Sequence, residues 1–247
     1  MTLRTVERAI NVLYHVCESD YPMNLTEVSK ALELDKATTL RLLSTLVSGD
    51  LLKQDAQTRS YYIGPGILRL SRFWRHDLRS ICRPHLESLL DQVDETICLI
   101  EPRGLDRICI DVLEPKKELR VVAELGRVQP IYSGASGRVL LASLPEQEML
   151  AILDQVDLLQ LTPQSVTERT QYLDEIRLAR KQGYAYAIDQ VIVGSAGVSA
   201  PIADANGEVV AAVVVRGPAA RITKDLSKEI GAAVRQVAKD IEGHLNG

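Results

Sequence analysis

The 247-residue sequence predicts an α+β protein with two domains. The smaller N-terminal domain is expected to hold helices and a hairpin, and the larger C-terminal α/β domain a mixed, mainly antiparallel sheet. Apolar residues recur at helical spacing up to about residue 48, and two short strand patterns follow them. In the second half, β-branched runs stand on both sides of a helical middle section. This order favours a mixed sheet over a regular βαβ repeat.

Three helices and a hairpin are predicted for residues 1–64. The first helix runs from Thr5, its expected N-cap, to about Cys17. Asn24-Leu25-Thr26-Glu27 has the pattern of a capping box and opens a second, short helix. Asp35 can cap a third helix, which begins at Lys36 and ends before Gly49. The runs on either side of the polar loop 55–59 then predict two paired strands, Leu51–Gln54 and Ser60–Ile63.

A linking helix is expected within residues 65–77, after the break at Gly64-Pro65-Gly66 and including Trp74. Residues 78–247 form the second domain, and Asn206-Gly207 predicts a hairpin turn within it. Its expected helices cover 78–93, Gly137–Leu144, Pro145–Gln155, Tyr172–Gln182 and Leu226–Leu245. Its expected strands cover Thr96–Ile100, Arg107–Leu113, Leu119–Leu125, Tyr184–Ile188, Ser195–Ile202 and Glu208–Val215.

Composition narrows the class of protein. No apolar run reaches 18 residues, and the first residues lack the apolar stretch of a secretory signal, so we expect a cytoplasmic protein with no membrane partner. The four cysteines form no CxxC pair and have no histidine at metal-ligand spacing, so neither a metal nor another cofactor is expected. GxSxG, HExxH and phosphate-loop patterns are absent, which argues against an enzyme.

Positive charge is concentrated in one segment. Residues 36–75 carry seven Lys and Arg against two Asp, a net charge of +5, whereas residues 76–247 carry 19 basic and 25 acidic side chains, a net charge of −6. A polyanion is the natural partner of that basic segment. Three helices and a hairpin with this charge predict a winged helix-turn-helix that binds double-stranded DNA.

The third helix is expected to present its polar side chains to the major groove. With Ala37, Leu40 and Leu43 taken as buried, the outward side chains are Thr38, Thr39, Arg41 and Thr45. Lys36 and the helix N-terminus suit a phosphate, and Arg59, expected at the tip of the hairpin loop, suits a minor groove or the DNA backbone. Two alternatives remain: the polar face merely solvates the helix, or the winged helix docks a protein instead of DNA.

The sequence resembles the IclR family of bacterial regulators along nearly its whole length. The motifs that carry the resemblance stand in the same order as in that family. They are Thr5–Leu13, Leu25–Leu32, Lys36–Leu46, Tyr62–Pro65, Gly126-Arg127, Pro130–Ser133, Gly137–Ala142, Gly183–Ala185, Ala200–Ile202 and Arg216–Pro218.

The resemblance implies a winged helix-turn-helix joined by a helix to a GAF-like effector domain. It also implies homodimers, often paired into homotetramers, and control by a small organic acid or aromatic metabolite. Members of the family include repressors and activators.

The resemblance further implies an effector pocket. It is expected at the loop Ser133-Gly134-Ala135-Ser136, at the turn holding Asp189 and along the last two strands, where Gly197 leaves room for a ligand. This sequence departs from the family in two places: of a common run of acids only Asp189 remains, and Val214 and Arg216 replace serines. We therefore expect an anionic effector with Arg216 as its bidentate partner. In the alternative reading, Arg216 points outward or pairs with Asp189.

Overall fold

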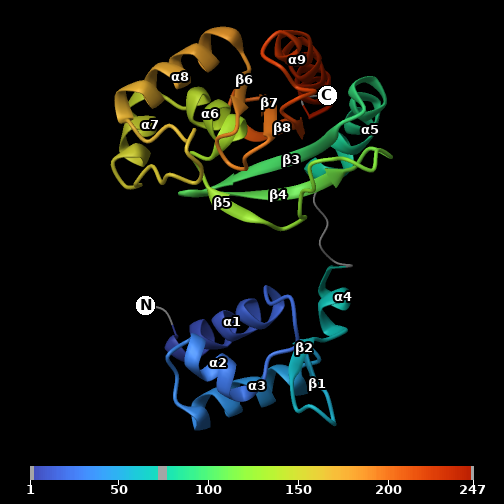
Figure 1. Ribbon diagram of the computed structural model, residues 1–247, viewed down its shortest axis with the longest axis vertical. Helices are drawn as coiled ribbons and strands as arrows, with labels where there is room; N and C mark the ends of the chain where they lie inside the picture. Colours follow the sequence, from blue (N-terminus) through green and yellow to red (C-terminus); the bar gives the residue numbers. More distant parts are fainter. Residues whose placement is uncertain (1–2, 72–76, 246–247) are drawn as a thin grey trace. The chain divides into compact units, whose positions relative to one another are not determined.

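The protein is described here by a computed structural model that covers residues 3–71 and 77–245, with the side chains of Ser71 and Asp77 not described. The chain divides into two compact units, Met1–Arg75 and His76–Gly247, called below the N-terminal and C-terminal units (Figure 1). The boundary falls within the segment 65–77, where the sequence predicts a linker.

Three helices and a two-stranded hairpin form the N-terminal unit, as predicted. They are α1 (Arg4–Cys17), α2 (Leu25–Ala31), α3 (Lys36–Ser48), β1 (Leu52–Gln54) and β2 (Tyr61–Ile63), followed by α4 (Gly66–Ser71). The hairpin strands are antiparallel, with Lys53 opposite Tyr62. Arg72, Trp74 and Arg75, which the sequence places in or near the linking helix, lie outside the described residues.

The predicted helix caps are confirmed at two of three starts. The Asn24 side chain accepts from the amides of Thr26 and Glu27 at 2.9 and 3.1 Å, and Glu27 accepts from the Asn24 amide at 2.7 Å, which completes the capping box. The prediction of Thr5 as a cap is wrong: α1 begins one residue earlier, after Leu3, and no side chain caps it.

Helix α1 has two apolar faces. Val12 and Val16 are buried in the N-terminal unit's core, together with residues of α2, α3 and the hairpin. A second row, spaced three or four residues apart, is exposed and consists of Leu3, Val6, Ile10 and Tyr14. One face of α1 therefore holds the unit together and the other has no partner within the described part of the chain.

The C-terminal unit contains the remaining elements. Its helices are α5 (Asp77–Val93), α6 (Gly134–Ser143), α7 (Glu146–Leu153), α8 (Arg169–Gln182) and α9 (Leu226–Leu245). Its strands are β3 (Thr96–Arg103), β4 (Asp106–Leu113), β5 (Val128–Pro130), β6 (Ala185–Ile188), β7 (Ser195–Ala203) and β8 (Val209–Pro218). Asn206 and Gly207 occupy the turn between the antiparallel strands β7 and β8, with Gly207 at φ +80°, so the predicted hairpin is confirmed.

Six strands form one sheet in the order β5-β4-β3-β8-β7-β6. Every pairing described is antiparallel, so the predicted α+β class is confirmed while the expected mixed character of the sheet is corrected. The strand predicted at Leu119–Leu125 is also wrong: that stretch is irregular, and the short strand β5 after it takes the edge position beside β4.

Helices cover both faces of this sheet (Figure 1). Helices α5 and α9 pack on one face, and α6, α7 and α8 lie on the other. Alternation along β8 follows from this: Val213 and Val215 enter the core under α9, whereas Ala212 and Val214 enter the core under α6. Arg216, two residues beyond Val214, consequently faces α6.

A buried ion-pair cluster ties α5 to the sheet. Asp111 on β4 is fully buried and meets Arg79 at 3.0 Å and Arg83 at 2.9 Å. The register of β4 against β3 shifts between Leu99 and Ile100, which are paired with Asp111 and Cys109. Because of this bulge, Asp111 faces α5 even though Cys109, two residues earlier, faces α6.

No helix among the described residues is long and apolar enough to cross a membrane.

Candidate DNA-reading helix and effector pocket

Helix α3 is capped as predicted, by the Asp35 side chain, which accepts from the Thr38 amide at 2.8 Å. This hydrogen bond lowers the pKa of the Asp35 carboxyl, because it favours the ionised form. The buried side chains follow at helical spacing and are Thr39, Leu42, Leu43 and Leu46. One side of α3 therefore packs into the core of the N-terminal unit, and the opposite side is exposed to solvent.

The prediction of which α3 side chains face outward is wrong by about one residue along the helix. Thr39, expected to point outward, is 0% exposed, and its hydroxyl donates to the Asp35 carbonyl at 2.9 Å. That bond satisfies the hydroxyl, so the side chain can be buried without an unpaired polar group. Leu40, expected in the core, is 43% exposed, and Ala37 is exposed as well.

The outward face of α3 keeps most of the predicted polar residues. Lys36, Arg41 and Thr45 are exposed and Thr38 is half-buried. Thr45 donates its hydroxyl to the Arg41 carbonyl at 2.8 Å, so only its lone pairs and methyl group remain for a partner. Sequence reasoning missed three exposed members of this face: Ala37, Leu40 and Ser44. Small and apolar side chains there can contact thymine methyl groups.

Arg59 is exposed and lies one residue past the turn Ala56–Thr58, not at its tip. Its backbone is in the left-handed region at φ +61°, and its amide donates to the Asp55 carbonyl at 3.0 Å. The side chain of Gln54 donates to the Arg59 carbonyl at 3.0 Å. These bonds fix the backbone from which the arginine projects.

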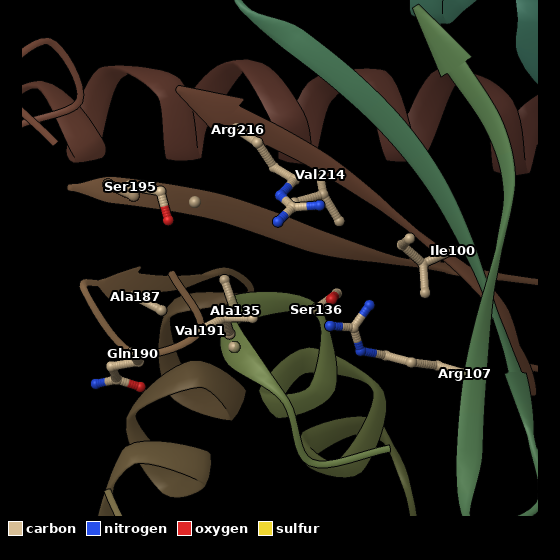
Figure 2. Close-up of a pocket in the computed structure, with 13 residues that line it drawn as sticks. Ile100, Arg107, Ala135, Ser136, Ala187, Gln190, Val191, Ser195, Val214 and Arg216 are labelled. Carbon is tan, nitrogen blue, oxygen red and sulfur yellow. The ribbon is translucent and has the colours of Figure 1, made fainter. Parts of the chain in front are cut away.

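A cavity of about 40 Å³ opens beside the N-terminus of α6 in the C-terminal unit and is called here the α6 pocket. Figure 2 shows its lining side chains, which come from β3, β4, α6, the β6–β7 segment and β8. The lining residues are Ile100, Arg107, Gly134, Ala135, Ser136, Ala187, Gln190, Val191, Ser195, Ala196, Gly197, Val214 and Arg216.

Arg216 lies in the α6 pocket, as one of the two readings predicts. It is directly opposite Gly197 in the β7–β8 pairing, and directly opposite Thr96 in the β3–β8 pairing. Side chains opposite one another in a sheet lie on the same face about 5 Å apart. Because Gly197 has none, the space there is left to the guanidinium of Arg216 and to the cavity in front of it.

The first turn of α6 supplies small residues and backbone amides. Gly134 has φ +64°, and a Cβ on it would lie 3.0 Å from Val191 Cγ2, so both backbone and packing require glycine. The amides of the first turn have no partner inside the helix and can donate to an anion. Ser136 and Ala135 line the cavity beside them.

Two expected pocket residues lie elsewhere. Ser133 is buried next to a smaller cavity of about 20 Å³, and its hydroxyl has no hydrogen-bond partner. Asp189 does not line the α6 pocket: its carboxylate accepts from the Gly194 amide at 2.6 Å and closes the β6–β7 turn, where Asp189 itself has φ +57°. Asp189 thus shapes the loop that carries Gln190 and Val191, which do line the pocket.

Sequence reasoning missed Arg107, which faces Arg216 across the pocket. It is 7% exposed and donates from Nη2 to Gln129 Oε1 at 2.9 Å. Burial and the charge of Arg216 lower the pKa of the Arg107 guanidinium to about 10. The one available signal was a charged residue beginning an otherwise apolar alternation, Arg107-Ile108-Cys109-Ile110.

The pocket's charge also reaches the nearby thiols. A hydrogen bond with Cys109 and the charges of Arg216 and Arg107 lower the pKa of the buried Cys98 thiol. Within 3–71 and 77–245, no group of three or more His, Cys, Asp and Glu side chains could hold a metal ion.

These two units define a class of protein. A winged helix-turn-helix with an exposed recognition helix reads DNA, and an α/β unit with a polar cavity at a helix N-terminus binds a small molecule. The combination is that of a ligand-responsive transcriptional regulator.

Comparison with known proteins identifies the family. Residues 5–56 match the IclR helix-turn-helix domain, and residues 71–243 match the C-terminal domain of the bacterial transcriptional regulator IclR. The chain is 31% identical over 244 residues to the HTH-type transcriptional repressor AllR of Escherichia coli K12, covering 98% of this chain and 90% of that protein. This chain therefore belongs to the IclR family of transcriptional regulators, and it is not an enzyme.

Solved structures share the fold. The IclR structure of Thermotoga maritima aligns with a TM-score of 0.80 at 25% identity over 100% of both chains. An IclR homologue of Microbacterium hydrocarbonoxydans, solved in complex with 4-hydroxybenzoate, aligns with a TM-score of 0.83 at 20% identity over 98% of both chains.

Proposed function

We propose that this regulator's binding to its operator is controlled by a small anionic metabolite, a carboxylate or aromatic acid, held in the α6 pocket. The observation that carries the proposal is Arg216, whose guanidinium faces the pocket and has no carboxylate partner within the described residues. Ala135 and Ser136 lie across the pocket from Arg216 (Figure 2), at the first turn of α6, whose amides can donate to an anion. The homologue from Microbacterium hydrocarbonoxydans was solved in complex with 4-hydroxybenzoate, a carboxylated ligand, which supports the proposal.

On the DNA side, we assign α3 to the major groove of a double-stranded operator. Lys36 and Thr38 lie at the helix start, where phosphates and base edges meet it, and Arg41 can form a bidentate contact to guanine. Thr45 and Arg59 complete the set of candidate DNA contacts. Thr39 is withdrawn from it because its side chain is buried.

We further propose that the protein acts as a homodimer, with paired dimers as the larger assembly, in the cytoplasm. The exposed row Leu3, Val6, Ile10 and Tyr14 on α1 is an apolar surface of the kind that two copies bury against each other. A symmetric pair of recognition helices would read a pseudo-palindromic operator.

Control by the metabolite requires unequal binding. The effector must bind more tightly to one arrangement of the dimer than to the other, because otherwise it shifts no population. Its effect on operator affinity can be no larger than the ratio of these two affinities.

The test combines a thermal-unfolding screen of carboxylates with operator titrations of full-length protein. We expect small organic acids to raise the Tm of wild type, because they bind only the native state, and to have no such effect on Arg216→Gln. An active acid should also change operator affinity. The proposal fails if only neutral or cationic compounds stabilise the protein. Operator affinity should fall steeply with salt; insensitivity to salt would point to a protein partner instead.

A further inference from the structure

We infer that the effector is a compact dianion, with one anionic group on Arg216 and the second on Arg107. The inference rests on the proposed function and narrows it from an anion to a dicarboxylate or equivalent. It is carried by two guanidinium groups that enter one small cavity from separate strands, β4 and β8 (Figure 2).

Arg107 is the more unusual of the two arginines. Its side chain is almost fully enclosed, and its Nε is buried without any hydrogen-bond partner. Within the described part of the chain, its side chain donates one hydrogen bond, to the neutral amide of Gln129 on the neighbouring strand. A nearly enclosed guanidinium that lines a cavity and has no carboxylate partner can take an acceptor from outside the chain.

No carboxylate among the described residues neutralises either arginine. The lining of the α6 pocket contains no Asp or Glu, and no carboxylate among the described residues forms an ion pair with Arg107 or Arg216. Arg138 provides an internal comparison: it is 2% exposed, lies in the same unit, and is paired with Glu175. Arg138 thus has a carboxylate counter-charge, whereas the similarly buried Arg107 and the half-buried Arg216 have none among the described residues.

A ligand with one negative charge would give a counter-charge to only one of the two arginines. It would neutralise one guanidinium, while the second would stay desolvated beside a cation. A ligand with two carboxylates gives each arginine a charge-assisted, bidentate partner. The mutual repulsion of the two arginines, which already lowers the pKa of Arg107, would be offset at the same time.

The size of the cavity limits the spacer between the two groups. About 40 Å³ corresponds to roughly three water positions, since one water needs about 10–15 Å³ on this measure. Malonate and succinate exceed this volume by less than longer or bulkier dicarboxylates do, so the size of the cavity favours them. Gly197 and Val214 supply a small, uncharged wall for the spacer.

The decisive experiment compares matched acids on full-length protein by calorimetric titration. The pairs are malonate against propanoate and succinate against butanoate, which differ by one carboxylate. We expect at least one dicarboxylate to bind about tenfold or more tightly than its partner, because a hydrogen-bonded charge pair contributes at least that factor. Arg107→Gln should abolish the preference while leaving the weaker monocarboxylate binding in place.

A ligand-free measurement keeps the inference testable on its own. Arg107→Gln should raise the Tm of the ligand-free protein, because it removes a buried cation that lacks a counter-charge. The control is Arg127→Gln, which removes an exposed arginine paired with Glu124 and should leave Tm and the preference unchanged.

The possible outcomes distinguish the dianionic effector from the more general proposal of an anionic effector. Monocarboxylates that bind as tightly as dicarboxylates, and that need Arg216 alone, would overturn the dianion and leave the proposed function standing. An unchanged preference in Arg107→Gln would do the same. Failure of every acid to bind wild type would overturn both.

Discussion

Two glycines of the α6 pocket should respond in different ways to the same substitution. Gly134 has φ +64°, where an alanine costs about 1–2 kcal/mol, and its Cβ would press on Val191 Cγ2 at 3.0 Å. Gly197 lies in a regular strand, and a Cβ there would meet its nearest neighbours at 3.6–3.9 Å, an ordinary contact distance. Both alanines gain the same roughly 0.4–1 kcal/mol from a less flexible unfolded chain.

The difference between the variants therefore isolates the strain. Gly134→Ala should be less stable than Gly197→Ala by about 1–2 kcal/mol, and Gly197→Ala should match or exceed wild type. For a unit of this size, 1 kcal/mol shifts the Tm by about 2–4 °C, so the two transitions should differ by roughly 2–8 °C.

The measurement is differential scanning calorimetry of full-length protein, following the transition of the C-terminal unit. Circular dichroism at low temperature checks that both variants fold. Equal Tm values, or a lower Tm for Gly197→Ala, would show that the backbone at the start of α6 is not held as described.

Three further substitutions test other parts of the structure. Arg41→Ala should weaken operator binding by about 1–3 kcal/mol in a fluorescence-anisotropy titration, whereas Thr39→Val should bind like wild type; the reverse order would restore the rotation of α3 that the sequence predicts. Asp111→Asn should lower the Tm and cost about 1–3 kcal/mol of unfolding free energy, because its arginine partners are partly exposed. Removal of the exposed Glu87 carboxylate should cost under about 1 kcal/mol. Similar losses of stability in the two variants would contradict the burial of Asp111. The pKa of Asp35 is lowered in the folded state, so its cap stabilises the N-terminal unit above the carboxyl's unfolded pKa and loses that effect as pH falls through the folded pKa; Asp35→Asn should flatten this acid-side loss in a pH series of thermal melts.

Most helices and strands could be predicted because their patterns are local. The capping box at Asn24 and the turn at Asn206-Gly207 are encoded within four residues, and α9 matches its predicted range Leu226–Leu245. The strand predicted at Leu119–Leu125 failed because β propensity needs a partner. The position beside β4 is filled by β5, which leaves Leu119 and its apolar neighbours exposed.

The rotation of α3 could not be fixed from sequence because two stripes compete. Helical spacing is met both by Leu40 with Leu43 and by Leu42 with Leu46. Packing against α1, α2 and β1 decides that Leu42 and Leu46 are buried and that Leu40 is exposed. The buried stripe also includes Thr39, whose hydroxyl donates to the Asp35 carbonyl and so carries no unpaired polar group into the core.

The α6 pocket was half predictable. Period-two alternation along β8 places Arg216 beside Val214, and the departure from the family pointed to its charge. Arg107 could not be found in the same way, since an arginine after the turn at Gly104 resembles an ordinary surface residue until β5 covers it. Asp189 was expected in the pocket, but a short acidic side chain can equally accept a hydrogen bond from a backbone amide in a turn, as Asp189 does from Gly194.

The strand order has a consequence for synthesis on the ribosome. Strand β3 is made early but lies between β4 and β8, and β8 ends only at Pro218, with α9 still to come. The N-terminal unit, by contrast, draws its core from residues between Val12 and Tyr61. A nascent chain can thus complete the N-terminal unit well before the C-terminal unit. Until translation nears its end, the six-stranded sheet is incomplete, and its apolar faces and unpaired strand edges are exposed to aggregation.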